Sequence, residues 1–346
     1  MDIILEVVDS FIADHFYAWA FPAHQAPLDF PGDFASNATT ALTSWQYKPS
    51  TTWFPIPVTE AAYNTAVPRD NLLRQSISFF FIFWVFGALV YFIFATLSYI
   101  FVFDKETFKH PKYLKNQIRL EMIQANMSFP GMALMTVPIC LAEVNGWSKL
   151  YDTSADGPGR WWDIMQFPAF VFFTDFSIYL IHRGLHHPMV YKRFHKPHHK
   201  WIVPTPFASH AFHPVDGYLQ GLPYHIFPFL FPLNKIAYIC LFVFINFWTI
   251  MIHDGEYIAN NPIINGAACH AIHHIAFNYN YGQFTTFWDR VGNSYRAPDQ
   301  ELFKKEQKKS QTFWKKQAKQ MEEIGAEVEG EDDRVYAAEE ETKKTI

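Results

Sequence analysis

Residues 76–103 read SISFFFIFWVFGALVYFIFATLSYIFVF, a run of 28 residues without a charged side chain. As an α-helix this run would be about 42 Å long, which exceeds the ~30 Å hydrocarbon core of a bilayer. Arg74 and Asp104 flank the run. The stretch therefore predicts a helix that crosses a membrane with some tilt.

Three more apolar windows follow along the chain. Residues 122–142 carry no charge, residues 164–181 carry only Asp175, and residues 218–252 carry only Lys235. One such window is also typical of a buried core helix, but four in one chain favour a membrane protein. The last window is too short for two full spans of about 20 residues, so we expect a short or re-entrant hairpin, with one tilted helix as the alternative.

The composition supports this class. Of 346 residues, 50% are hydrophobic and 18% are charged, and the net charge is −5. The apolar content excludes a disordered chain, and the lack of a basic surplus excludes a nucleic-acid binder. Three scattered cysteines exclude a disulfide scaffold. We predict an all-α polytopic membrane protein with about four transmembrane or re-entrant helical segments.

The distribution of lysine and arginine predicts how the chain is oriented in the membrane and how it divides into regions. Residues 104–121 and 182–200 each carry five of these cations, so both segments are predicted to face the cytosol. The chain then divides into a luminal N-terminal region (1–75), two transmembrane helices with a basic cytosolic loop (76–163), a histidine-rich catalytic region (164–296) and a charged cytosolic tail (297–346).

The tail is predicted from its charges. Residues 300–320 favour a lysine-rich helix suited to an anionic membrane surface or to solvent, and residues 322–341 are strongly acidic and predict disorder. The last four residues, KKTI (343–346), are similar to a dilysine retrieval signal of the endoplasmic reticulum.

Thirteen of the sixteen histidines lie between His182 and His274. They form three boxes: HRGLHH (182–187), HKPHH (195–199) and HAIHH (270–274). Positions i, i+3 and i+4 of a helix share one face, so imidazoles at this spacing can converge on one point. The pattern predicts metal binding on a cytosolic cap beside the spans.

The donor set narrows the choice of metal. Eight or more histidines exceed the needs of one ion and suit two, and all-imidazole sites suit iron, copper or zinc. No Asp or Glu occurs from Phe176 to Val215, which excludes a Glu-x-x-His di-iron bundle. A pair of irons that activates O2 is the preferred interpretation. Bis-histidine haem is the competitor, because His182/His195 and His186/His199 are each thirteen apart.

The candidate ligands include one histidine outside the boxes, His253, which follows the last apolar window. The predicted set is His182, His186, His195, His198, His199, His253, His270, His273 and His274. Residues predicted to support the ligands, or to be weaker candidates, are His187, His210, His213, Asp175, Asp254 and Glu256. His225 lies in the apolar hairpin and is a candidate substrate contact.

The three boxes resemble those of the membrane fatty acid hydroxylase/sterol desaturase superfamily, over about residues 164–296. HKPHHKWIVPTPFASHAFHPVDG (195–217), IHDGEY (252–257) and NYNYGQFTTFWDRVGNSYR (278–296) closely resemble fungal sterol C-5 desaturases. This resemblance implies an enzyme of the endoplasmic reticulum that places a C5–C6 double bond in a Δ7-sterol (episterol-type) during ergosterol synthesis. It also implies a di-iron centre, O2 as co-substrate, and electrons from NADH through cytochrome b5 and its reductase.

Two other functions use the same features. A sibling enzyme, such as a sterol C-4 methyl oxidase or a lipid hydroxylase, has the same boxes and differs in its product. A non-enzymatic membrane metal-binding protein would bind metal without consuming O2 or reductant. The partners expected for the enzyme are the sterol, membrane lipids and cytochrome b5. The cytochrome is expected to be a separate protein, because no HPGG haem-binding signature occurs in the chain.

Overall fold

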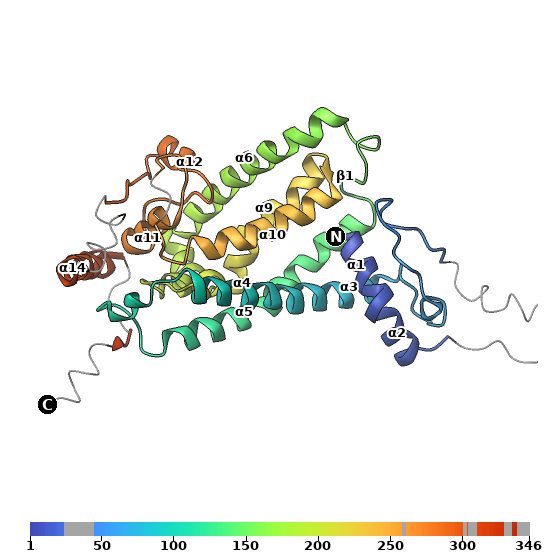
Figure 1. Cartoon of the computed structure of the whole chain (residues 1–346), viewed down its shortest axis with the longest axis horizontal. Helices are drawn as coiled ribbons and strands as arrows, with labels where there is room; N and C mark the ends of the chain where they lie inside the picture. The colour runs from blue at the N-terminus through green and yellow to red at the C-terminus, as the bar shows by residue number, and fades with distance from the viewer. Residues whose placement is uncertain (24–44, 258–260, 300–302, 304–309, 329–333, 338–346) are drawn as a thin grey trace, which may run out of the picture. The chain divides into compact units, whose positions relative to one another are not determined.

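The computed structural model describes residues 1–23, 45–257, 261–299, 303, 310–328 and 334–337 (Figure 1). The predicted dilysine signal lies outside these residues. The chain divides into two compact units: a first of Met1–Phe86, Ala133–Gln166 and Pro228–Cys240, and a second of Gly87–Met132, Phe167–Phe227 and Leu241–Ile346. Nearly all of the regular structure is helical, which confirms the predicted all-α class.

Three helices are long and apolar enough to cross a membrane. They are the continuous helix Leu72–Phe101, made of α3 (Leu72–Phe81), η3 (Ile82–Phe86) and α4 (Gly87–Phe101), then α5 (Gln117–Val144) and α6 (Arg160–Leu185). Only 22, 39 and 33% of their most apolar windows are buried. A core helix would hide these side chains, so their exposure favours contact with lipid.

The fourth apolar window forms a helical hairpin. Its two helices are α9 (Pro214–Leu230) and α10 (Lys235–Met251), and the strand β2 (Leu233–Asn234) lies between them. At 17 residues each, the helices are about 25 Å long, shorter than a bilayer core of ~30 Å. The structure thus has the predicted short hairpin in place of the single tilted helix.

The first unit holds the N-terminal helices against the start of α3 with buried ion pairs. These helices are α1 (Asp2–Val8), η1 (Asp9–Ala13) and α2 (Asp14–Ala20), and the unit also contains η2 (Glu60–Ala62) and β1 (Leu150–Tyr151), which pairs in parallel with β2. Arg74 lies 2.8 Å from Asp9 and 2.6 Å from Asp14. Buried charges are costly unless they are paired, so this network fixes the N-terminal segment.

The second unit carries the short helices that follow the spans. They are η4 (Lys105–Lys109), α7 (Pro188–Val190), η5 (Tyr191–His195), α8 (Lys196–His199), η6 (Pro206–His210), α11 (Ala267–Ala276), α12 (Phe287–Val291) and α14 (Gln311–Val328). The Tyr91 hydroxyl on α4 donates to the carbonyl of Phe207 at 2.8 Å, and its ring packs against Phe129 of α5. This core holds the α8–η6 segment against the helices.

The tail differs from its prediction. Residues 322–341 are predicted to be disordered, but α14 continues to Val328 and packs on α11, with Phe313 and Ile324 against Ile272 (Figure 1). The short segment 334–337 also packs against the rest of the second unit, through a β-bridge between Tyr336 and Leu114. The Tyr336 side chain is 3% exposed and packs with Leu114 and Trp201. The prediction is wrong for these parts, because a few apolar side chains anchor an otherwise acidic segment.

Candidate metal centre

The nine predicted ligands come from separate parts of the second unit. His182 and His186 lie one turn apart at the end of α6, and His253 follows α10. His195 closes the π-helical turn η5, and the other box histidines lie on α8 and α11. A π-helical turn holds one extra residue per turn and is frequent at functional sites, and this one leads directly into the second box.

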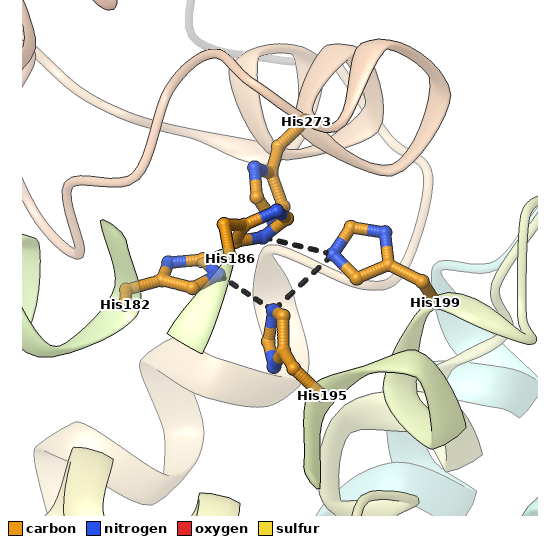
Figure 2. A group of neighbouring side chains, drawn as sticks. All are labelled: His182, His186, His195, His199 and His273. Atoms are coloured by element: carbon orange, nitrogen blue, oxygen red, sulfur yellow. Dashed lines mark hydrogen bonds between the residues drawn. The ribbon is translucent and has the colours of Figure 1, made fainter. Parts of the chain in front are cut away.

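The first group consists of five imidazoles with their ligand atoms within 4.8 Å of one another: His182, His186, His195, His199 and His273 (Figure 2). The Nε2 atoms of His182 and His195 are 3.1 Å apart. The Nε2 atom of His199 is 3.2 Å from that of His195 and 3.2 Å from that of His186.

The second group consists of His198, His253, His270 and His274, all buried, and their ligand atoms also lie within 4.8 Å of one another. The Nε2 atom of His270 is 2.9 Å from that of His253 and 3.1 Å from that of His274. Neighbours in sequence divide between the groups, because His198 and His199 point in different directions from α8, and His273 and His274 do so from α11. The two groups therefore share two helices.

The hydrogen bonds of the outer ring nitrogens show that the groups suit a cation. Nδ1 of His182 faces the carbonyl of Tyr281 at 3.0 Å, so it carries the proton and leaves Nε2 as a bare lone pair. Nδ1 of His195 faces the carboxylate of Asp216, so it also carries the proton and leaves its Nε2 with a bare lone pair. Two lone pairs 3.1 Å apart repel each other unless a positive ion lies between them. Nitrogens at right angles on an ion, each about 2.1 Å away, are roughly 3 Å apart.

Unpartnered nitrogens support the same assignment. Nε2 of His273 is buried without a hydrogen-bond partner, while its Nδ1 faces the Tyr279 carbonyl at 2.8 Å. Nδ1 of His253 likewise faces the Thr249 carbonyl at 2.7 Å, which leaves its Nε2 bare. A buried polar atom without a partner is costly, and a bound metal ion removes that cost.

Burial disfavours the charged form of a histidine, and metal ligands must be neutral imidazoles. It lowers the pKa of His253 to about 4. Burial, reinforced by neighbouring imidazoles, also lowers the pKa well below its usual value for His198, His199, His270, His273 and His274. The lone pairs are therefore free for a metal at neutral pH, and the histidine groups are compatible with iron.

Asp216 is a residue that the sequence analysis missed. It lies in the first turn of α9, is fully buried, and accepts a hydrogen bond from Nδ1 of His195 at 2.8 Å. Its other carboxylate oxygen accepts from Gln220 at 2.7 Å. A carboxylate on a ligand imidazole fixes the tautomer and makes the nitrogen more basic. The available signal was its position, since it is the first acidic residue after the acid-free stretch that ends at Val215.

The carbonyls of Tyr279 and Tyr281 belong to one loop, and two buried carboxylates hold that loop. Asp175 on α6 accepts the backbone N–H groups of Gln283 and Phe284, at 3.1 and 2.8 Å. Asp289 accepts those of Tyr281 and Gly282, at 2.9 and 2.8 Å. Asp175 thus acts on the loop and not directly on a histidine.

The structure places three other predicted histidines outside both groups. The exposed His187 accepts the N–H of Met189 and caps α7. Nε2 of His210 lies 3.3 Å from the amide oxygen of Asn246. Nδ1 of His213 accepts the backbone N–H of Val215. None of the three contributes to the groups as the structure has them.

The remaining candidates are also placed. His225 is buried in α9, and its ring lies 6.2 Å from that of Phe242. Asp254 accepts the backbone N–H of Glu256 at 2.8 Å. None of the hydrogen bonds to imidazoles described above comes from Asp254 or Glu256.

Comparison with known proteins agrees with the geometry. The fatty acid hydroxylase family matches residues 167–294, which contain both histidine groups. The chain is 62% identical to a probable Delta(7)-sterol 5(6)-desaturase of Neurospora crassa, over all of both chains. It is 59% identical to the Delta(7)-sterol 5(6)-desaturase of Leptosphaeria maculans, over 99% of each chain.

A less similar relative gives the same result. The identity to the Delta(7)-sterol 5(6)-desaturase of Eremothecium gossypii is 50%, over 97% of this chain and 99% of that one. No solved structure matches. Identity of this degree over the whole length, with the histidine boxes in place, shows that the chain belongs to the Delta(7)-sterol 5(6)-desaturase family of membrane oxidoreductases.

Proposed function

We propose that this protein introduces the C5–C6 double bond into a Δ7-sterol, in an O2-dependent reaction at a non-haem di-iron centre, during ergosterol biosynthesis. The observation that carries the proposal is the convergence of nine imidazoles in two adjacent groups. These groups occur in a chain that is 62% identical, over its full length, to a probable Delta(7)-sterol 5(6)-desaturase.

The overall reaction has a fixed balance. Removing one hydrogen from C5 and one from C6 supplies two electrons and two protons, whereas reducing O2 to two waters takes four of each. Two further electrons and two protons are therefore needed, and we propose that the electrons come from NADH through cytochrome b5 and its reductase. Bound irons would supply the activation of O2 and the removal of hydrogen.

The chain's own residues prepare the site. Asp216 and the loop carbonyls fix which nitrogen of His182, His195 and His273 faces inward. Eight of the nine histidines are buried and His186 is half-buried, so the groups are shielded from bulk water. A dry site limits side reactions of activated oxygen. The sterol itself is apolar, and we propose that it enters from the bilayer.

The location is part of the proposal. The exposed apolar surfaces of α4, α5 and α6 support a multi-pass membrane protein. The basic segments 104–121 and 182–200 support a cytosolic position for the histidine groups, and we propose that the membrane is that of the endoplasmic reticulum.

The test is a sterol assay on membranes from fungal cells that lack their own C-5 desaturase and express this chain. With a Δ7-sterol, NADH and air, we expect a conjugated 5,7-diene, identified by its ultraviolet spectrum and mass, that does not form without O2. His273→Ala should lower the product at least 100-fold, whereas the matched control His187→Ala should retain it. A hydroxylated or demethylated sterol in place of the diene would assign the chain to a sibling activity.

A further inference from the structure

A groove of about 490 Å³ in the second unit is lined by cations. Its charged lining residues are Lys115, Lys192, Lys196, Lys200 and Arg334, and no carboxylate is among the described residues that line it. Lys192, Lys196 and Lys200 lie within nine residues of one another in the chain, and together they give the groove a positive potential. Such a concentration of charge favours an acidic ligand or partner.

The groove is built on the helix that carries the metal-binding box. Lys196 and Lys200 flank His198 and His199 at the two ends of α8. The side-chain amide of Gln124, on α5, donates to the carbonyl of Pro197 at 3.0 Å and so ties α8 to the groove wall. The groove and the two histidine groups therefore use opposite sides of one short helix.

The tail completes the other wall. Arg334 lines the groove, and its guanidinium donates to the carbonyl of His199 at 3.2 Å. Val335 lines the groove beside it, and the carbonyl of Val335 accepts the backbone N–H of Lys115 at 3.2 Å. This wall is thus fixed by a side-chain hydrogen bond to the metal-binding segment and by a backbone hydrogen bond to Lys115.

We infer that this groove is the docking site for the acidic face of the protein that donates electrons. The inference rests on the proposed function, whose balance requires two electrons from outside. Charge complementarity steers such partners and sets their orientation. A donor seated here would be separated from His198 and His199 only by α8. Binding of a phospholipid headgroup would account for the positive charge of the groove, but it would not account for the position of the groove on α8.

The experiment uses the full-length enzyme in bilayers of neutral lipid, with the soluble haem domain of cytochrome b5 as the donor. The groove variant is Lys192→Glu, Lys196→Glu and Lys200→Glu. The control variant, with the same change of charge, is Lys315→Glu, Lys316→Glu and Lys319→Glu on the exposed side of α14. We expect the KM for the donor to rise at least tenfold in the groove variant and to stay unchanged in the control. Added salt should raise the KM of the wild type towards that of the groove variant.

A second variant covers the case in which the triple change disturbs the ligands. The double variant Lys115→Glu and Lys192→Glu alters the groove and leaves the sequence of α8 unchanged. We expect it to keep the iron content of the wild type and still to raise the KM for the donor. Failure of this double variant to do so would overturn the inference.

The remaining outcomes separate the docking site from the proposed function. Chemical reduction with dithionite, followed by one exposure to O2, needs no docking and should give the same diene yield in wild type and in the double variant. If the wild type gives no diene by this route, the proposed function itself is wrong. If the diene forms and the donor KM is unchanged, docking at the groove is overturned. In that case, loss of binding to phosphatidylserine vesicles by the groove variants alone would assign the groove to lipid.

Discussion

The Nδ1 atom of His195 lies 2.8 Å from a carboxylate oxygen of Asp216, and both side chains are completely buried. This contact turns Nε2 of His195 towards the Nε2 atoms of His182 and His199. One carboxylate on α9 therefore fixes the central imidazole of the first group, although it touches none of the other four.

Replacing Asp216 by Asn should weaken metal binding. The amide is neutral and supports the wrong tautomer of His195 if its NH2 group faces the ring, so we expect a 10–100-fold loss of iron affinity, in the range usual for such partners. Iron retained after dialysis against a chelator measures this. The exposed Asp299→Asn is the matched control. Equal retention by both variants would show that Asp216 does not act on the site.

Replacing Asp289 by Ala should affect one group of histidines more than the other. The loop that it holds presents the Tyr281 carbonyl to His182 and the Tyr279 carbonyl to His273, both in the first group. His253 of the second group is oriented by the backbone carbonyl of Thr249, which belongs to α10, and the loop contacts Thr249 through a hydrogen bond from the Gln283 side chain to its hydroxyl at 3.4 Å. We expect bound iron to fall from the two proposed ions per chain to about one, measured by elemental analysis against protein concentration. Loss of both ions together would contradict this division.

Replacing Tyr336 by Ala should release the tail. The Tyr336 ring is buried against Leu114 and Trp201, and removing a buried aromatic side chain costs about 3–5 kcal/mol. Local opening should then expose the bond after Arg334, and tryptic cleavage there should accelerate at least tenfold. The adjacent Val335 is 63% exposed, so Val335→Ala is the matched control and should cleave at the wild-type rate. A similar rate for both variants would mean that Tyr336 is not the anchor.

Acid should destabilise the contact between His110 and α14. Burial lowers the pKa of His110 to about 4, and its Nδ1 accepts the N–H of Lys112 while Nε2 faces Gln317. The unfolded chain, with an ordinary histidine pKa near 6.5, takes up the proton first as pH falls. The stabilisation is thus complete above pH ~6.5 and is lost between there and pH ~4, by about 3 kcal/mol in all.

The variant His110→Gln tests this sign. Between pH 7 and pH 4.5 its melting temperature in detergent should fall less than that of the wild type, because it has no proton to gain at this position. The exposed His15→Gln serves as control and should follow the wild type. Parallel melting curves for wild type and His110→Gln would contradict the assignment.

Much of the fold was predictable because its signals are local. Windows with at most one charged residue predicted α4, α5 and α6, and the shortness of residues 218–252 predicted the hairpin of α9 and α10. The anchoring of Tyr336 was not predictable, because it depends on a hydrophobic contact with Leu114, 222 positions earlier in the chain. Acidic composition alone gave the wrong expectation there.

The candidate site was predictable in its members but not in its arrangement. The histidine boxes supplied eight of the nine histidines that the structure brings together, and His253 was selected by its position after the last apolar window. Their role as ligands stays a prediction. The separation of His198 from His199 depends on where α6 and α11 lie around α8, which no local pattern specifies. Asp216 was missed for a similar reason, since its contact with His195 spans 21 positions and a helix start.

The wide separation of the nine histidines along the chain also bears on how the protein is made. His182 is synthesised 92 residues before His274, and each group needs at least one histidine of the last box. A nascent chain that has not reached α11 therefore has incomplete groups, whatever the iron supply. Metal loading should accordingly be a late event in biogenesis, and truncated chains should leave the ribosome without a reactive metal centre.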